Sequence, residues 1–355
     1  MTESTTHDVS GADGRFAPVP TPGTNESPNR EALRREIEAW LDSEAFTTLA
    51  SAEGAQADGT LEERLAYLDG FSAAEWDFRA RAARARAAGY LERNQVDRDL
   101  VDGPREELVF AAARALGLVD PRPPQRDHYD YVLVLGGLVR ANVSRSQYAA
   151  HLLRSGRVST ASVAALTAFR PLARNESDKT QDEHRLLETL ELPDRATEAE
   201  VLGDALADAF GLPDAPTIPA RGEEDTGRFG VATTSDGART VTLVAAPNPA
   251  SSRRANTGQT MRYWAREVAH VKAGQRILFV TSAIYVPFQH AVALQNLGLP
   301  FGATVETVGV DPATLRPGLA AASFRGVNYL QELRSAVRAY RSLVRSLDEN
   351  AGGRG

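Results

Sequence analysis

The order of apolar and polar positions along the chain changes near residue 120. Between residues 29 and 120 apolar residues recur at helical spacing; Leu33, Ile37, Trp40 and Leu41, for example, share one helix face. This spacing predicts a small all-helical domain over 29–120. The proline-rich stretch "DPRPPQRD" then prevents a helix from continuing.

Beyond this joint, short apolar runs of strand length alternate with helical patterns. The runs cover residues 131–135, 163–169, 241–246, 277–281 and 304–310. Strands that are apolar on both faces and separated by helices are typical of a parallel sheet covered on both sides. We therefore predict a three-layer α/β ligand-binding domain over 121–348 that ends in a long helix. Residues 1–28, which are polar and broken by Pro and Gly, are predicted to be a disordered tail.

Composition narrows the class of protein. Apolar residues make up 42% of the 355 residues, and the formal net charge of -7 argues against a general nucleic-acid binder. The chain has no cysteine, which excludes disulfides and thiolate ligands. No segment approaches the roughly 18 apolar residues of a membrane span, and the start does not resemble a signal peptide. We expect a cytoplasmic protein without a membrane span.

The segment "YDYVLVLGGLVRANVSR", residues 129–145, carries the first candidate site. Gly136 and Gly137 stand where a strand ends, and ligands of open parallel sheets bind beyond such ends. Paired glycines there allow a close approach to the backbone. Arg140 and Arg145 follow at the start of a helix, an arrangement that favours an anion such as a phosphate or carboxylate. A Gly-Gly turn that only makes room for packing is the alternative.

Two further strand ends carry similar residues. A loop after the strand at 241–246 holds arginines and polar residues before a helix start, and the strand at 277–281 ends in hydroxyl residues followed by an aromatic residue and a histidine. Arg170 adds positive charge after the strand at 163–169. Surface arginines and a structural histidine are the alternatives. The candidates are Ser252, Arg253, Arg254, Asn256, Thr257, Thr281, Ser282, Tyr285 and His290.

The charged stretch at 169–185 offers acidic residues, among them Glu183, that could act as a general base or bind a hard metal. A solvated loop with acidic residues in a first helical turn is the alternative. The six histidines are scattered without a metal-binding spacing, so we assign no metal site.

Three segments together resemble the SanA/ElyC/YdcF-type family of Rossmann-like α/β proteins. They are "DYVLVLGG" with "SRSQYAAHLLRSG", "SRRANT", and "ILFVTSA", and they span about half of the chain. The resemblance implies a Rossmann-like sheet and a pocket lined by Gly136, Gly137, Arg145, Ser252, Arg253, Asn256, Thr257, Thr281 and Ser282. The acidic and histidine positions of that family are absent here. The resemblance also makes a nucleoside-containing cofactor such as S-adenosylmethionine a candidate occupant.

Two functions remain open from the sequence. The first is binding of an anionic, nucleotide-like or phosphorylated small molecule at the carboxyl edge of the sheet, with or without catalysis. The second is a non-catalytic sensor or scaffold that binds a protein partner through its helical segments. The sequence identifies neither a reaction nor catalytic residues.

Overall fold

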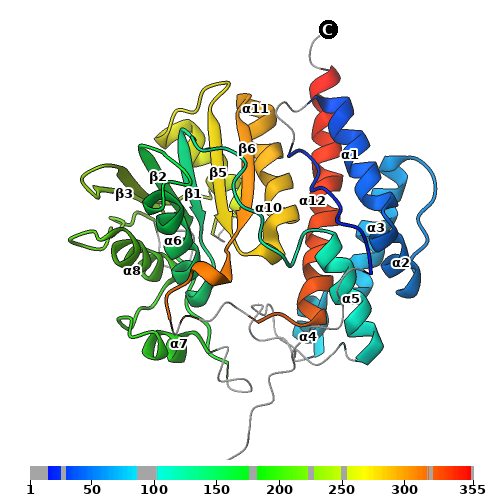
Figure 1. Ribbon diagram of the computed structural model, residues 1–355, viewed down its shortest axis with the longest axis horizontal. Coiled ribbons are helices and arrows are strands. Elements are labelled where there is room, and N and C mark those ends of the chain that lie inside the picture. Colours follow the sequence, from blue (N-terminus) through cyan, green and yellow to red (C-terminus); the bar gives the residue numbers. More distant parts are fainter. Residues whose placement is uncertain are drawn as a thin grey trace, which may run out of the picture.

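The structure, a computed structural model, describes residues 15–24, 29–85, 101, 103–175, 182–222, 228–248, 254–317, 319 and 323–352. The first part of the chain forms a layer of helices (Figure 1). Side-chain caps define where two of them start: the Asn29 side chain accepts from two backbone amides, and Thr60 and Glu63 form a reciprocal capping box. The helices of this layer are α1 (Arg30–Asp42), α2 (Glu44–Ala52), α3 (Leu61–Glu75), α4 (Phe78–Ala85) and α5 (Gly103–Ala115).

The second part contains a six-stranded sheet in the order β3-β4-β2-β1-β5-β6. All neighbouring strands are parallel except β3, which pairs antiparallel with β4 at one edge. The strand order reverses its direction of travel between β1 and β5, which makes this pair the switch point of the sheet. The strands are β1 (Tyr131–Leu135), β2 (Ser162–Thr167), β3 (Gly230–Ser235), β4 (Thr240–Ala245), β5 (Arg276–Thr281) and β6 (Thr304–Gly309).

Helices cover both faces of this sheet. Val132 and Val134 of β1 pack on the face that α6 (Val139–Arg154) and α8 (Glu198–Phe210) cover, whereas Leu133 and Leu135 pack on the other. That second face is covered by α9 (Thr257–Tyr263) and α10 (Val286–Ala293), each of which continues into a π-helical turn, Trp264–Val268 and Leu294–Gly298. Because successive side chains of a strand point to opposite faces of the sheet, each buried strand contributes to two separate apolar cores.

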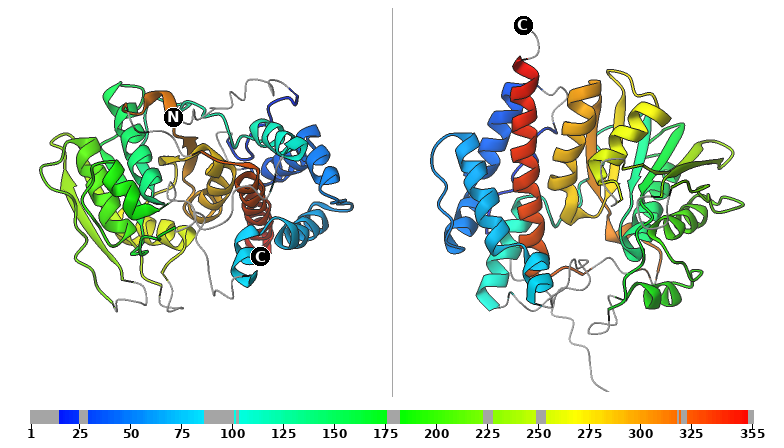
Figure 2. Two further views of the ribbon diagram at one scale, coloured as in Figure 1. Left: turned by 90° about the horizontal axis from the view of Figure 1, so that it is seen from below. Right: turned by 180° about the vertical axis from the view of Figure 1, so that it is seen from behind.

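The final helix, α12 (Gly326–Gly352), lies between α10 and the helical layer (Figures 1 and 2). Its Tyr340 ring meets Trp40 of α1 edge to face at 5.2 Å, and its Arg341 pairs with Asp69 of α3 at 2.5 Å. On its other side, Gln295 Nε2 donates to the hydroxyl oxygen of Ser342 at 2.8 Å. One apolar core therefore runs from the helical layer through α12 to the sheet.

The predicted fold class is confirmed: a helical region precedes a three-layer α/β sheet with a long closing helix. The pattern of apolar runs does not predict β3, the antiparallel edge strand. Residues 15–24 of the predicted tail lie against the helical layer, where Val19 N donates to Ala115 O at 2.8 Å; the rest of that tail lies outside the described residues. Among the described helices, none is both long and apolar enough to cross a membrane.

We expect Leu333→Ala to lower the free energy of unfolding by about 2–5 kcal/mol, because Leu333 is fully buried in the core that α12 shares with both neighbouring layers. Arg345→Ala, at an exposed position of the same helix, should change it by less than about 0.5 kcal/mol. Denaturant unfolding followed by circular dichroism measures both. Because the core is continuous, both parts should unfold in one transition; two separated transitions would contradict this.

Candidate functional site

The carboxyl ends of the parallel strands meet at one edge of the sheet. The pairing places Leu135 of β1 opposite Leu166 of β2, and Leu166 opposite Val244 of β4. On the other side of β1, Val134 stands opposite Val280 of β5. The loops that begin at residues 136, 168, 246 and 282 therefore leave the sheet along one line, which is where open parallel sheets bind ligands.

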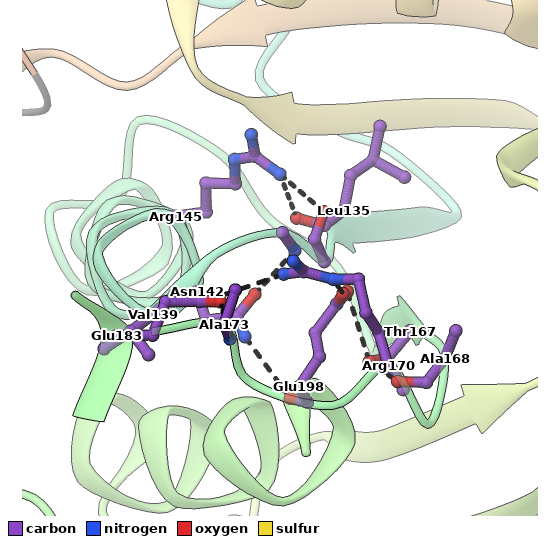
Figure 3. A network of polar contacts seen from close by, with 12 residues as sticks. Leu135, Val139, Asn142, Arg145, Thr167, Ala168, Arg170, Ala173, Glu183 and Glu198 are labelled. Atoms are coloured by element: carbon purple, nitrogen blue, oxygen red, sulfur yellow. Dashed lines mark hydrogen bonds and ion pairs between the residues drawn. The ribbon is translucent and has the colours of Figure 1, made fainter. Parts of the chain in front are cut away.

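Arg145 joins the ends of β1 and β5 across the switch point. Its Nη1 donates to Leu135 O at 2.6 Å and to Gly136 O at 2.8 Å (Figure 3). Its Nε and Nη2 reach Ser282 Oγ at 3.3 Å and 3.2 Å, and the guanidinium lies 5.4 Å from the centre of the Tyr285 ring. Only 2% of Arg145 is exposed. The Arg145 side chain therefore lies buried beneath the carboxyl edge of the sheet and is not exposed at the surface.

The two glycines make room for charged side chains of the protein itself. A Cβ atom at position 136 would stand 2.4 Å from Glu198 Oε1 and 2.7 Å from Leu166 O. A Cβ atom at position 137 would stand 3.1 Å from Arg145 Nη1. The sequence predicts a close approach to this backbone, and the groups that approach it here are a carboxylate and a guanidinium.

A buried polar network extends from these glycines beneath the ends of β1 and β2 (Figure 3). Arg170 Nε donates to Glu198 Oε2 at 2.8 Å, and Arg170 Nη2 lies 3.7 Å from Glu183 Oε1. Asn142 accepts from Gly137 N at 2.8 Å and donates to Glu198 O at 3.3 Å. Buried charges are stable only when paired in this way, so the network fixes the geometry of the edge.

Glu183 is a fully buried member of this network, with no exposed surface. It begins α7 (Glu183–Thr189), directly after the capping residue Asp182. Burial raises the pKa of its carboxyl, while Arg170 and the amides of Ala173 and Val139 oppose the change. A carboxyl with a raised pKa beside a guanidinium, at the ligand-binding edge of an α/β sheet, is typical of a functional site.

The remaining candidates in the loops after β1 and β4 lie nearer to solvent. Arg140, in the first turn of α6, is half-buried, and burial lowers the pKa of its guanidinium. Arg254 is exposed beside Asn256, which caps α9 by accepting from Gln259 N at 2.9 Å, and Thr257 is half-buried. Ser252 and Arg253 lie outside the described residues.

The loop after β5 contributes buried residues beneath the carboxyl edge of the sheet. Thr281 is fully buried, and its hydroxyl has no hydrogen-bond partner within the part of the chain that the structure describes. Ser282 receives Arg145, and the half-buried Tyr285 ring meets Phe324 edge to face at 6.2 Å. The structure thus brings Arg145, Ser282 and Tyr285 together.

His290 lies apart from this group, inside α10 and facing β6. Its Nδ1 is 3.1 Å from Thr307 Oγ1, and Nε2 has no hydrogen-bond partner among the described residues. Together with Thr21, His290 lines a cavity of about 40 Å³. Burial lowers the pKa of the imidazole to about 4, although the backbone of Gly23 and the charge of Glu36 act in the opposite direction. His290 is therefore neutral at pH 7.

Two members of the network, Glu198 and Asn142, are not among the candidate residues predicted from the sequence. Glu198 reads as an ordinary acidic residue in a first helical turn, because nothing local shows that it reaches the strand ends. Asn142 lies between Arg140 and Arg145 of α6 and could have been included on that position alone. Within the described residues, no group of three or more His, Asp or Glu side chains could hold a metal ion.

We expect Gly136→Ala to destabilise the protein by about 1–3 kcal/mol, because the added methyl overlaps the Glu198 carboxylate and a strand carbonyl. Gly70→Ala, within α3 and facing open space, is the matched control and should stabilise by up to about 1 kcal/mol. Thermal or urea unfolding measures both. Equal effects at the two positions would show that the space at Gly136 is not needed.

Stability should fall as the pH drops from 6.5 towards 4, because the unfolded chain takes up a proton at His290 before the folded protein does. The imidazole should account for about 2 kcal/mol of this loss at pH 5 and roughly 3 kcal/mol at pH 4. Urea unfolding of His290→Gln should show a weaker pH dependence over this range, whereas His128→Gln, at an exposed position, should behave like the wild type. Identical pH profiles for all three proteins would contradict the burial argument.

Comparison with known proteins gives a different family from the one that the motifs indicate. A family model described as the Rv3785 N-terminal domain matches residues 24–117. No solved structure matches the chain. The resemblance to the SanA/ElyC/YdcF family is therefore wrong, and the pocket that it implies has no support from kinship. The segments that carry the resemblance are strands that end in small or polar residues, and many parallel sheets contain such strands.

Relatives match nearly the whole chain. The sequence is 32% identical over 350 residues to "Uncharacterized protein Rv3785" of Mycobacterium tuberculosis, covering 92% of this chain and 93% of the relative. The same values apply to "Uncharacterized protein Mb3814" of Mycobacterium bovis. With this identity and coverage, the chain belongs to the Rv3785 family.

Proposed function

We propose that this is a cytoplasmic protein that binds a small anionic molecule, nucleotide-like or phosphorylated, at the carboxyl edge of the sheet beside the switch point. The observation that carries the proposal is Arg145, buried at that edge and bonded to the ends of both β1 and β5. Open parallel sheets bind ligands beyond the strand ends at such a switch point, and ligand sites are usually largely preformed with a few well-placed polar groups.

Arg140 and Arg254 are the guanidinium groups best suited to meet the ligand. Arg140 is half-buried and Arg254 is exposed, so both reach solvent at the edge where the loops converge. Guanidinium groups recognise phosphate or carboxylate through paired hydrogen bonds. Asn256, Thr257 and Ser282 would add neutral polar contacts on the same edge.

The contacts support binding more strongly than catalysis. Arg145, Arg170, Glu183 and Glu198 are all buried in internal contacts, which suits a role in shaping the site. The alternative scaffold function has less support from the helical layer. Apolar residues of that layer, including Trp40, pack inward around α12.

The binding proposal is tested by thermal-shift measurements with pyrophosphate, ADP, a uridine diphosphate sugar and S-adenosylmethionine. A ligand at 100 times its dissociation constant should add about 2.7 kcal/mol of stability. The double variant Arg140→Gln, Arg254→Gln should lose most of this stabilisation, because it removes both charges and keeps polar side chains. Arg35→Gln, on the exposed face of α1, is the matched control and should keep it.

Two results would contradict the proposal. One is that none of the four compounds raises the melting temperature of the wild type. The other is that the double variant responds as strongly as Arg35→Gln, which would place the ligand away from this edge.

A further inference from the structure

The amino terminus of α6 is the position where a sheet of this strand order most readily binds phosphate. The helix follows β1 directly at the switch point, and its free amides and dipole attract negative charge. Its capping residue, Leu138, has no side chain that can accept a hydrogen bond from these amides. Water, a polar side chain or an anion from elsewhere must therefore satisfy them.

Glu183 supplies this anion. The first amide of the helix, Val139 N, donates to Glu183 Oε1 at 3.3 Å, and Ala173 N donates to Oε2 at 2.7 Å. Arg170 lies 3.7 Å from the same carboxylate, which has no exposed surface (Figure 3). A backbone amide of the helix terminus, a loop amide and a guanidinium together form the kind of donor set that binds a phosphate or carboxylate group.

Two neighbouring donors are also occupied by the chain. Gly137 N, which precedes the helix, donates to Asn142 Oδ1, and Arg170 Nε donates to Glu198. A second anion at this terminus would face the carboxylates of both Glu183 and Glu198 at close range. Like charges in a buried site repel strongly, so the terminus disfavours an anionic group from a ligand.

We infer that Glu183 is a built-in anion of the α6 amino terminus and a residue that determines ligand specificity, because it keeps the phosphate or carboxylate of a ligand away from this terminus. The part that concerns the ligand rests on the proposed function. In this role, Glu183 directs the anionic group of the ligand to Arg140 and Arg254, on the solvent side of the carboxyl edge. The part that concerns the internal anion is independent of any ligand.

Chemical rescue tests the internal anion. Glu183→Ala deletes a methylene group and a carboxylate, which together have the size of acetate. The variant should melt at a lower temperature than the wild type. After refolding in sodium acetate, its melting temperature should rise by a few degrees and reach a plateau, relative to sodium chloride at equal ionic strength, whereas butyrate should be too large to act. The wild type should not respond to acetate.

Glu306→Ala is the matched control for this experiment. The Glu306 carboxylate also accepts a backbone amide, Gln125 N at 2.7 Å, but at an edge strand and not at a helix terminus. Acetate should raise its melting temperature no more than sodium chloride does. Failure of acetate to stabilise Glu183→Ala, or equal stabilisation of both variants, would overturn the inference and leave the proposed ligand site unaffected.

Glu183→Gln keeps the shape of the side chain and tests specificity, including the case in which Glu183→Ala does not fold. Removal of the negative charge should strengthen pyrophosphate binding roughly tenfold over the wild type, measured by isothermal titration calorimetry. Affinity that is unchanged or weaker would overturn the role in specificity. If pyrophosphate binds neither protein, the proposed function fails for this ligand, while the acetate result still decides on the internal anion.

Discussion

The structure depends on the pairing of charges that are buried at the carboxyl edge of the sheet. Arg145 and Arg170 each lie almost entirely inside the protein, and isolated charges there would cost several kcal/mol. Each connects loops and helix starts that follow different strands: Arg145 binds carbonyls at the end of β1 and Ser282 after β5, and Arg170 pairs with Glu183 and Glu198, which begin α7 and α8. These loops therefore hold one another in place, and the edge is preorganised before any ligand arrives.

More of the fold than of the candidate site could be predicted from the sequence. Five strands could be predicted because each contains an apolar run, which is buried on both faces in β1, β2, β4 and β5. The strand β3 was missed because it lies at the edge and reads as polar, with Thr233, Thr234 and Ser235 in sequence; the Asp236-Gly237 turn that follows was its available signal. The other edge strand, β6, could be predicted because its Val305 and Val308 are apolar and buried, whereas β3 has no comparable run.

The site shows the complementary limit. Paired glycines at a strand end correctly indicate that something approaches the backbone, because their small size is a local property. What approaches depends on tertiary structure: Glu198 and Arg145 reach the glycines from two different helices. A pattern read along one segment cannot distinguish a ligand from a distant side chain of the same protein. The same limit explains how strand-end motifs suggested the wrong family.

The position of α12 has a consequence for synthesis of the protein. The helical layer is translated before the sheet, yet the helix against which Trp40 packs is translated after the strands of the sheet. Until that segment emerges, the apolar face of the nascent layer has no permanent cover, and such exposed surfaces are where chaperones bind and aggregation begins. Cover of the helical layer is thereby delayed until α12 has been translated, so a product that stops before α12 would be exposed to quality control.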